Sequence, residues 1–387
     1  MKVAVVGCGQ TVFGEHWDKS LRDLATESLV SALKEGKINL KDIEALFVGN
    51  MSGGRFVGQE HVGALVADYA NLAPIPSVRC EGACASGALA FRQAYHAIKS
   101  GDYDIVAVTG VEKMTDLKIE DVTTTLMGAG DQEWEGSIGL TFPGLYALMA
   151  RAHMHKYGTT REQMAMVSVI NHKNGLNNPY AQYKKSITVE DVLKSPLVAD
   201  PLRLLDCSPI TDGAATVILA SERVARKFEN PIWVMACTQA SDTLALHDRK
   251  SLTELAAVKN AVKKAYETTG TGAGKMDVAE VHDCFSINEI LTIEGLGFCK
   301  DGAGGPFVEQ GKITLAGEIP VNTTGGLKSI GHPVGATGVR QIIDITRQLG
   351  GMSVNQIRGA KRGIALNVGG SGATAVVTIL GGSEYGP

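Results

Sequence analysis

Short runs of β-branched and other apolar residues alternate along the chain with longer stretches whose apolar positions recur every three or four residues. That spacing predicts amphipathic helices over Leu21–Lys34 and Leu252–Tyr266, because residues three and four apart share one face of a helix. Unbroken apolar runs such as Ile105–Thr109 and Gly363–Asn367 predict buried strands. Helices that alternate with such strands predict an α/β fold whose sheets are covered on both faces.

A weak internal duplication relates the two halves of the chain. Each half repeats the same order: an amphipathic helix, a buried run, a small-residue turn before a second helix, another strand, and a closing apolar strand. The matching segments are Asp42–Asn50 with Asp277–Phe285, Cys84–Ala88 with His332–Ala336, and Asp212–Leu219 with Ser371–Thr378. Two similar halves, each too apolar to stand alone, are expected to pack face to face.

The duplication predicts three units along the chain. The first half comprises residues 1–115 and 195–230, and the second half comprises residues 231–387. Residues 116–194 interrupt the first half and are expected to form a loop domain or lid, since long insertions in compact folds are usually functional.

Composition excludes several classes of protein. The 387 residues carry a formal net charge of −4, which gives no electrostatic case for nucleic acid, whose binders show a concentrated basic face. No window approaches the roughly 18 apolar residues of a membrane span. The first residues lack the core of a signal peptide, so we expect a cytoplasmic protein with no membrane partner. The seven cysteines include no Cys-x-x-Cys pair, and in a reducing compartment they are expected to be free thiols.

Cys84 is the first candidate for chemistry. It lies in a turn of small residues between a predicted strand, Ile75–Val78, and a predicted helix, Leu89–Lys99. A thiol at a helix N-terminus is expected to favour the thiolate, and pKa values of about 3.5–7.5 are reached in such places. The alternative is a small core cysteine that precedes a helix.

His332 occupies the position that matches Cys84 in the second half. It precedes the predicted helix Val339–Leu349, and by itself it would be no more than a helix cap. Two-fold packing of the halves would bring the two turns together and place a base beside the thiol. A cysteine paired with a histidine in this way is what nucleophilic catalysis requires.

Two further motifs follow buried strands in the second half. Residues 281–285 place His282 and Cys284 on one face and Asp283 on the other, because side chains alternate along a strand. A metal site there would need ligands from elsewhere, and none is expected. The turn Asn367–Gly372 would leave backbone N–H groups free to stabilise an oxyanion, or its glycines would serve only a tight turn.

These motifs together resemble those of the thiolases, and the resemblance runs the whole length of the chain. Cys84–Gly87 is similar to the family's nucleophile motif and Gly331–Pro333 to its histidine motif, while Leu204–Pro209 and Asp212–Ala215 are also typical. The resemblance implies the thiolase fold, a duplicated five-layer α-β-α-β-α core with an inserted loop domain.

Two departures from the pattern point to one branch of that family. Many thiolases carry Asn-Glu-Ala-Phe where this chain has His282-Asp283-Cys284-Phe285, and a second catalytic cysteine in Cys-x-Gly where it has Asn367-Val368-Gly369. The His-Asp-Cys-Phe form resembles the sterol-carrier-protein-type and archaeal thiolases, in which that cysteine replaces the missing one.

The resemblance implies a reversible Claisen condensation of two acetyl-CoA to acetoacetyl-CoA, through an acyl-cysteine. It assigns the nucleophile to Cys84, its base to His332 and the α-carbon base to Cys284. The backbone N–H groups of Cys84 and Gly369 would hold the tetrahedral oxyanion, and His282 with His332 the enolate oxygen. CoA thioesters enter as substrates, and neither a cofactor nor a metal is implied.

The resemblance also implies partners and leaves alternatives open. A homodimer or homotetramer is expected, as is a supply of acetoacetyl-CoA to the mevalonate pathway, with HMG-CoA synthase attached through a zinc-binding OB-fold protein. The alternatives are a degradative 3-ketoacyl-CoA thiolase of broader chain length, a ketoacyl or HMG-CoA synthase, and a non-catalytic scaffold or lipid-binding homologue. Cys284 argues against both synthases. The acyl pocket is expected around Met127–Leu148, with its depth undetermined.

Overall fold

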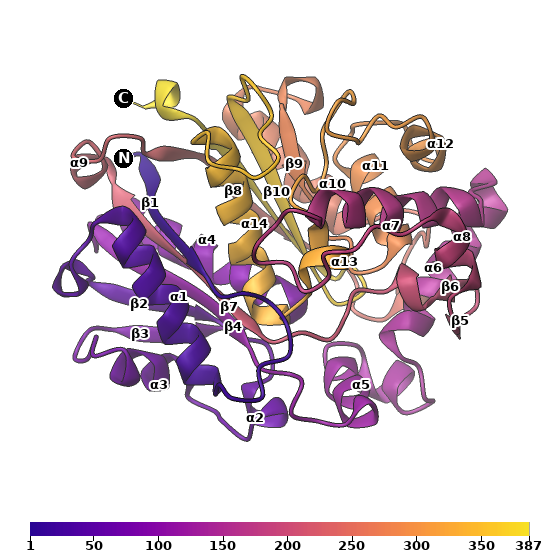
Figure 1. The fold of residues 1–387 in the computed structure, drawn as a ribbon, viewed down its shortest axis with the longest axis horizontal. Coiled ribbons are helices and arrows are strands. Elements are labelled where there is room, and N and C mark those ends of the chain that lie inside the picture. Colours follow the sequence, from indigo (N-terminus) through magenta and orange to yellow (C-terminus); the bar gives the residue numbers. More distant parts are fainter. Residues whose placement is uncertain (387) are drawn as a thin grey trace.

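A nine-stranded mixed sheet lies at the centre of the computed structural model, which describes residues 1–386 (Figure 1). Its strand order is β3-β2-β4-β7-β1-β8-β11-β10-β9. The strands are β1 (Val3–Gln10), β2 (Ala45–Gly49), β3 (Ser77–Cys80), β4 (Ile105–Glu112), β7 (Gly213–Ser221), β8 (Ile232–Ser241), β9 (Val278–Glu280), β10 (Arg362–Gly369) and β11 (Thr374–Gly381). The predicted α/β class is confirmed.

The sheet repeats one arrangement in each half. β2 pairs with β4 in parallel and β4 with β7 antiparallel, just as β9 pairs with β10 and β10 with β11. An isolated parallel bridge from Ala279 to Val321 stands where β3 lies in the first half. The halves meet edge to edge through β1 and β8, which share two residue pairs, Ala4–Trp233 and Val5–Ile232. The half-sheets are therefore hydrogen-bonded into one sheet as well as packed.

Two central helices separate the half-sheets. α4 (Ser86–Ser100) contacts β2 and β4, and α14 (Val334–Leu349) contacts β4, β7 and β10 as well as α4. Outside them, α1 (Leu21–Gly36) covers β1 and β7, while α10 (Ala256–Thr269) covers β8 and β11. This is the predicted five-layer order. β4 and β7 are buried along their whole length because helices cover both faces.

Both central helices begin earlier than their apolar periodicity predicts. α4 begins at Ser86, within the cysteine motif, and α14 begins at Val334, directly after the histidine motif. The early turns consist of small residues that the apolar pattern does not mark, and Pro333 supplies the N-cap of α14. The predicted strand Ile75–Val78 is displaced to Ser77–Cys80. Cys84 and His332 therefore each lie two residues before the start of a central helix.

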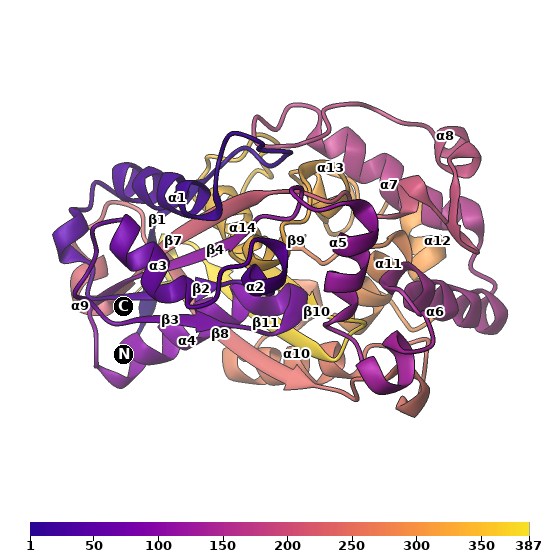
Figure 2. The same cartoon turned by 90° about the horizontal axis from the view of Figure 1, so that it is seen from below.

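The segment between β4 and β7 leaves the core and covers the second half. Its helices are α5 (Ile119–Met127), α6 (Phe142–Tyr157), α7 (Arg161–Gly175) and α8 (Val189–Lys194), followed by the hairpin β5 (Leu197–Ala199) and β6 (Leu202–Arg203). α7 starts at a capping box and packs on three second-half helices, α11 (Ser286–Gly295), α12 (Gly304–Glu309) and α13 (Gly326–Ile330). Figure 2 shows these helices gathered at one end of the molecule. The residue limits of the three units remain predictions.

The remaining helices are short. They are α2 (Gly53–Phe56), α3 (Val62–Tyr69), α9 (Glu222–Ala225) and the single-turn segments η1 (Leu40–Asp42), η2 (Ala83–Ala85), η3 (Gln132–Gly136), η4 (Leu204–Asp206), η5 (Leu246–Asp248), η6 (Ala273–Lys275) and η7 (Ser383–Tyr385). Within residues 1–386, no helix combines the length and the apolarity needed to cross a bilayer.

Glycines let the first turns of α4 and α14 touch backbone to backbone. A Cβ added to Gly87 would lie 2.6 Å from the carbonyl oxygen of Gly335, and one added to Gly335 would lie 2.7 Å from that of Gly49. A Cβ on Gly338 would lie 2.4 Å from the amide nitrogen of Ala88. All three distances are shorter than a carbon can approach. A side chain at Gly87 or Gly338 would therefore force the two helices apart, and one at Gly335 would push α14 away from β2.

We expect Gly87→Ala to destabilise the protein by about 1–3 kcal/mol, because a methyl group in a packed contact shifts its neighbours. It should also lower catalytic activity, since the shift separates α4 from α14. Midpoints of urea denaturation and steady-state kinetics of the soluble variant measure the two effects.

Gly274→Ala is the matched control, because Gly274 is exposed and a Cβ there meets nothing within 4 Å. Its stability should stay within about 0.5 kcal/mol of the parent. Equal effects of the two substitutions would show that the α4–α14 contact tolerates a side chain.

Candidate active site

Three side chains distant in sequence meet where α4 and α14 begin. The sulfur of Cys84 and one ring nitrogen each of His282 and His332 lie within 4.8 Å of one another. The two imidazoles cross nearly at right angles, with ring centroids 5.0 Å apart. Cys84 belongs to η2 before α4, His332 precedes α14, and His282 follows β9. The structure therefore joins the two turns that the duplication pairs.

Cys84 is half-buried and protonated at neutral pH. Burial raises the pKa of its thiol to about 12, and the charges of Glu112 and Glu81 raise it further. The backbone groups of Gly370 and of Cys84 itself favour the thiolate but offset only part of this effect. The predicted low thiol pKa is wrong, because the loss of water around the sulfur outweighs the helix N-terminus.

His332 is held by a threonine on the helix that it precedes. Its Nδ1 lies 2.7 Å from Oγ1 of Thr337, and that hydroxyl donates to the carbonyl of Pro333 at 3.0 Å. The backbone N–H of His332 donates to Oγ1 of Thr211. Burial and the charge of Arg340 lower the pKa of His332 to about 3, so the ring is neutral.

His282 is held by an asparagine on β10. Its Nδ1 lies 3.1 Å from Nδ2 of Asn367, and its backbone carbonyl accepts from Nδ2 of Asn288. The ring is fully buried, and burial together with the neighbouring His332 lowers its pKa well below the usual value. Like His332, it is a neutral imidazole. Within residues 1–386, Nε2 of neither ring has a hydrogen-bonding partner.

Cys284 lies beside this group, and Asp283 faces away, as the alternation predicts. Asp283 accepts the backbone N–H groups of Leu327 and Lys328 at the start of α13. Burial raises the pKa of the Cys284 thiol, and a charge on Cys84 would raise it further. Regular strand structure ends at Glu280, earlier than predicted, so His282 and Cys284 belong to the loop between β9 and α11.

The glycine-rich turn after β10 lies against the cysteine segment. A Cβ on Gly369 would lie 2.3 Å from the carbonyl oxygen of Gly82, so Gly369 packs directly on residues next to Cys84. Of the two backbone groups that favour the Cys84 thiolate, the one with the larger effect belongs to the next residue, Gly370. Gly370 has φ 61°, and its carbonyl accepts from the hydroxyl of Tyr146 at 3.0 Å.

Tyr146 and the partners of the imidazoles were missed from sequence. Tyr146 stacks on Phe285, with ring centroids 4.6 Å apart, and its hydroxyl favours the thiolate of Cys284. The sequence pattern marks Asn367 only as part of a turn and does not mark Thr337. One signal was available for Asn367. It is a polar residue within the apolar run Gly363–Val368, and a buried amide needs a hydrogen-bonding partner.

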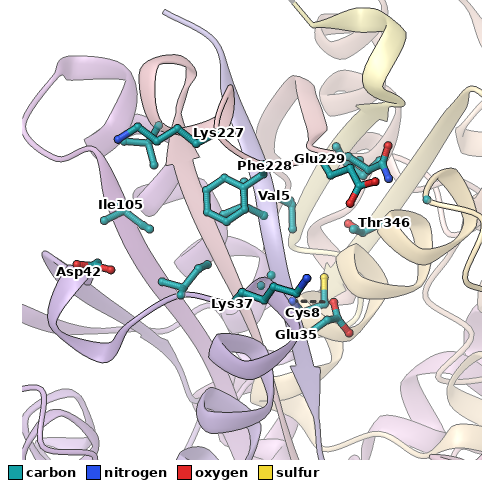
Figure 3. Close-up of a pocket in the computed structure, with 18 of the residues that line it drawn as sticks. Val5, Cys8, Glu35, Lys37, Asp42, Ile105, Lys227, Phe228, Glu229 and Thr346 are labelled. Carbon is teal, nitrogen blue, oxygen red and sulfur yellow. Dashed lines mark hydrogen bonds between the residues drawn. The ribbon is translucent and has the colours of Figure 1, made fainter.

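A separate cleft of about 870 Å³ lies at the opposite end of the sheet (Figure 3). It is lined by residues from the middle of β1 and the ends of α1 and α14, including Cys8, Glu35 and Thr346. Acidic and basic side chains are mixed around it, Glu35 and Glu229 with Lys37 and Lys227 among them. None of the candidate catalytic residues lines this cleft.

Comparison with known proteins agrees with this geometry. The model of the thiolase N-terminal domain matches residues 3–223, and that of the thiolase C-terminal domain-like family matches residues 238–382. An acetyl-CoA acetyltransferase of Methanothermobacter thermautotrophicus is 53% identical over 98% of this chain and 99% of its own. Human sterol carrier protein 2 is 33% identical over 97% of this chain and 71% of its own.

Solved structures show the same fold. Human mitochondrial 3-ketoacyl-CoA thiolase superposes with a TM-score of 0.73 at 19% identity, over 99% of each chain. The chain belongs to the thiolase family, and it is an acyltransferase of that family. The predicted family and fold are confirmed.

Alkylation of Cys84 should report its raised pKa. A thiol with a pKa of about 12 is protonated at neutral pH, and its thiolate fraction grows roughly tenfold per pH unit. We therefore expect the rate of iodoacetamide labelling at Cys84, followed by peptide mass spectrometry, to rise steadily between about pH 7 and pH 10. Any label that remains in the Cys84→Ala variant is on the other cysteines and can be subtracted. A rate that is already constant near neutral pH would contradict the raised pKa.

Proposed function

We propose that the protein catalyses the reversible condensation of two acetyl-CoA to acetoacetyl-CoA and CoA. The observation that carries the proposal is the meeting of the Cys84 sulfur with ring nitrogens of His282 and His332, next to a second thiol, Cys284. Its support from the comparisons is the acetyl-CoA acetyltransferase that matches nearly the whole chain.

The first half-reaction transfers an acetyl group to Cys84. Nε2 of neutral His332 accepts the thiol proton as the sulfur attacks the thioester carbonyl, so no free thiolate accumulates. Backbone N–H groups of Cys84 and of the turn at Gly369 and Gly370 stabilise the tetrahedral oxyanion. The intermediate collapses, CoA leaves with the proton from His332, and acetyl-Cys84 remains.

The second half-reaction forms the carbon–carbon bond. Nε2 of His332 first takes the thiol proton of Cys284, and the hydroxyl of Tyr146 favours the resulting Cys284 thiolate. That thiolate removes a proton from the methyl group of a second acetyl-CoA. The Nε2–H of His282 and the Nε2–H that His332 gained from Cys284 stabilise the enolate oxygen. The enolate carbon attacks the acetyl carbonyl on Cys84, and the Cys84 sulfur leaves and takes a proton from His332 as acetoacetyl-CoA forms, while Cys284 keeps the proton from the methyl group. Thiolysis is the same sequence in reverse.

We propose that neither a metal nor a bound cofactor takes part. A histidine that ligates a metal almost always donates its other ring N–H to an acceptor. His282 instead faces the amide nitrogen of Asn367, which only donates. That partner suits an imidazole that carries its proton on Nε2, where a metal would need a lone pair.

Two thiol variants test the division of labour between the half-reactions. Cys84→Ala should show no gain of one acetyl mass after incubation with acetyl-CoA, because the nucleophile is absent. Cys284→Ala should gain that mass and yet form no acetoacetyl-CoA, since only the α-carbon base is missing. Intact-protein mass spectrometry and the absorbance of the magnesium–enolate complex of acetoacetyl-CoA measure the two outcomes.

Cys237→Ala is a matched control, because Cys237 is a buried thiol on β8 that serves neither step. It should keep both acetylation and condensation. Acetylation of the Cys84 variant, or normal condensation by the Cys284 variant, would overturn the assignment.

We further propose a cytoplasmic homodimer or homotetramer that passes acetoacetyl-CoA to HMG-CoA synthase for the mevalonate pathway, through a zinc-binding OB-fold protein. β3 supports self-association: its one strand neighbour in residues 1–386 is β2, and Val78 on it is exposed. An edge strand of this kind suits isologous pairing.

Affinity purification of the tagged chain from its native source tests these partners. Co-elution of HMG-CoA synthase with a small zinc protein, at a mass above one copy of this chain, is the expected result. A monomer that elutes alone would contradict both the assembly and the transfer.

A further inference from the structure

The two imidazoles of the site are held through Nδ1 by partners of opposite chemistry. Thr337 presents a hydroxyl oxygen to His332, and Asn367 presents an amide nitrogen to His282. Both partners are buried, Thr337 completely and Asn367 to all but 2% of its surface. Water therefore does not compete for either contact, and each partner determines which ring nitrogen carries the hydrogen.

The hydroxyl of Thr337 is an acceptor toward His332. Its single hydrogen points to the carbonyl of Pro333, four residues earlier on α14, at 3.0 Å. At a distance of 2.7 Å, Nδ1 of His332 must then supply the hydrogen of the contact with Oγ1. A neutral imidazole has one N–H, so Nε2 of His332 carries a lone pair.

The amide of Asn367 is a donor toward His282. An amide nitrogen has hydrogens and no acceptor capacity, so Nδ1 of His282 must supply the lone pair of this contact at 3.1 Å. The hydrogen of the neutral ring is then on Nε2. Gly338 leaves room for the amide: a Cβ there would lie 2.2 Å from Oδ1 of Asn367, so only glycine admits this side chain beside α14.

We propose that Thr337 and Asn367 are positioning residues that lock the two facing imidazoles in opposite tautomers. The cleft then presents one Nε2 lone pair, on His332, and one Nε2–H, on His282. The proposal rests on the proposed acyl transfer, because it explains how two neutral histidines divide the work in that reaction.

The tautomer of His332 suits proton transfer from Cys84, and the tautomer of His282 suits donation to a substrate oxygen. The lone pair of His332 accepts the Cys84 proton, which an Nε2–H at that place would be unable to do. The Nε2–H of His282 is ready to donate to a carbonyl or enolate oxygen before any proton has moved. Both Nε2 atoms are buried without a partner among residues 1–386, which is costly until a substrate oxygen or the thiol proton satisfies them.

Nitrogen-15 NMR of histidine-labelled protein without substrate tests the tautomers directly. A protonated ring nitrogen and one with a lone pair have widely separated shifts. We expect His332 to be protonated on Nδ1 and His282 on Nε2, with the signals assigned by their loss in His332→Asn and His282→Asn. The same tautomer in both rings would overturn the proposal even if Cys84 is acetylated normally.

Kinetic variants separate positioning from stability. Thr337→Val should slow acetylation of Cys84 roughly 10- to 100-fold, the usual effect of losing a partner that orients a histidine. Thr337→Ser keeps the hydroxyl and should restore the rate. Thr346→Val is the matched control, because Thr346 is a buried threonine on the same helix, roughly 14 Å from Thr337. Equal slowing by Thr346→Val, or none by Thr337→Val, would contradict the positioning role.

A double-mutant cycle tests Asn367. Asn367→Ala should slow condensation more than acetylation in the parent enzyme, because the hydrogen of His282 is then no longer fixed on Nε2. In a His282→Asn background the same change should have almost no further effect, since an amide has no tautomer to lock. Independent effects of the two substitutions would contradict the proposal. A parent enzyme that is never acetylated would instead refute the proposed function and leave the NMR result standing.

Discussion

The close approach of α4 and α14 is the constraint on which the site depends. Gly87, Gly335 and Gly338 let the two helices meet through their backbones, and this contact sets how near Cys84 can come to His332. Each residue sits at the start of its helix, where direction and position are fixed by the first turn. The separation of thiol and base is thus decided by the absence of side chains a few residues away, within an interface that has no room to relax.

Burial then sets the protonation states. The same loss of water raises the pKa of Cys84 and lowers that of His332, so the resting pair is a neutral thiol beside a neutral imidazole. A charge-separated pair would need solvation that this cleft does not offer. The positive charge of buried Arg340, held by Asp344 and Glu280, adds to the effect on both histidines. Proton transfer is consequently coupled to arrival of the substrate carbonyl.

The pseudo-two-fold arrangement fixes where the two turns lie, and the residue at each turn determines its chemical role. Cys84 and His332 occupy equivalent turns, and the same fold places sulfur in one half and imidazole in the other. His282 and Cys284 enter from the loop after β9, with Asp283 between them holding the start of α13. The aspartate anchors the loop from behind, so that the two reactive side chains point the same way. Duplication thus builds one asymmetric site from two similar halves.

The alternation of helices and strands, the duplication and the motif residues can all be predicted from the sequence, since these follow from local periodicity and spacing. It misplaced the starts of α4 and α14, whose first turns lack an apolar pattern. Tertiary structure alone decided the raised pKa of Cys84, the edge-to-edge joining of β1 and β8, and the contacts of Thr337 and Asn367 with the two histidines. Burial and long-range contacts are properties of the packed chain, and no local pattern records which distant atom will lie beside a given nitrogen.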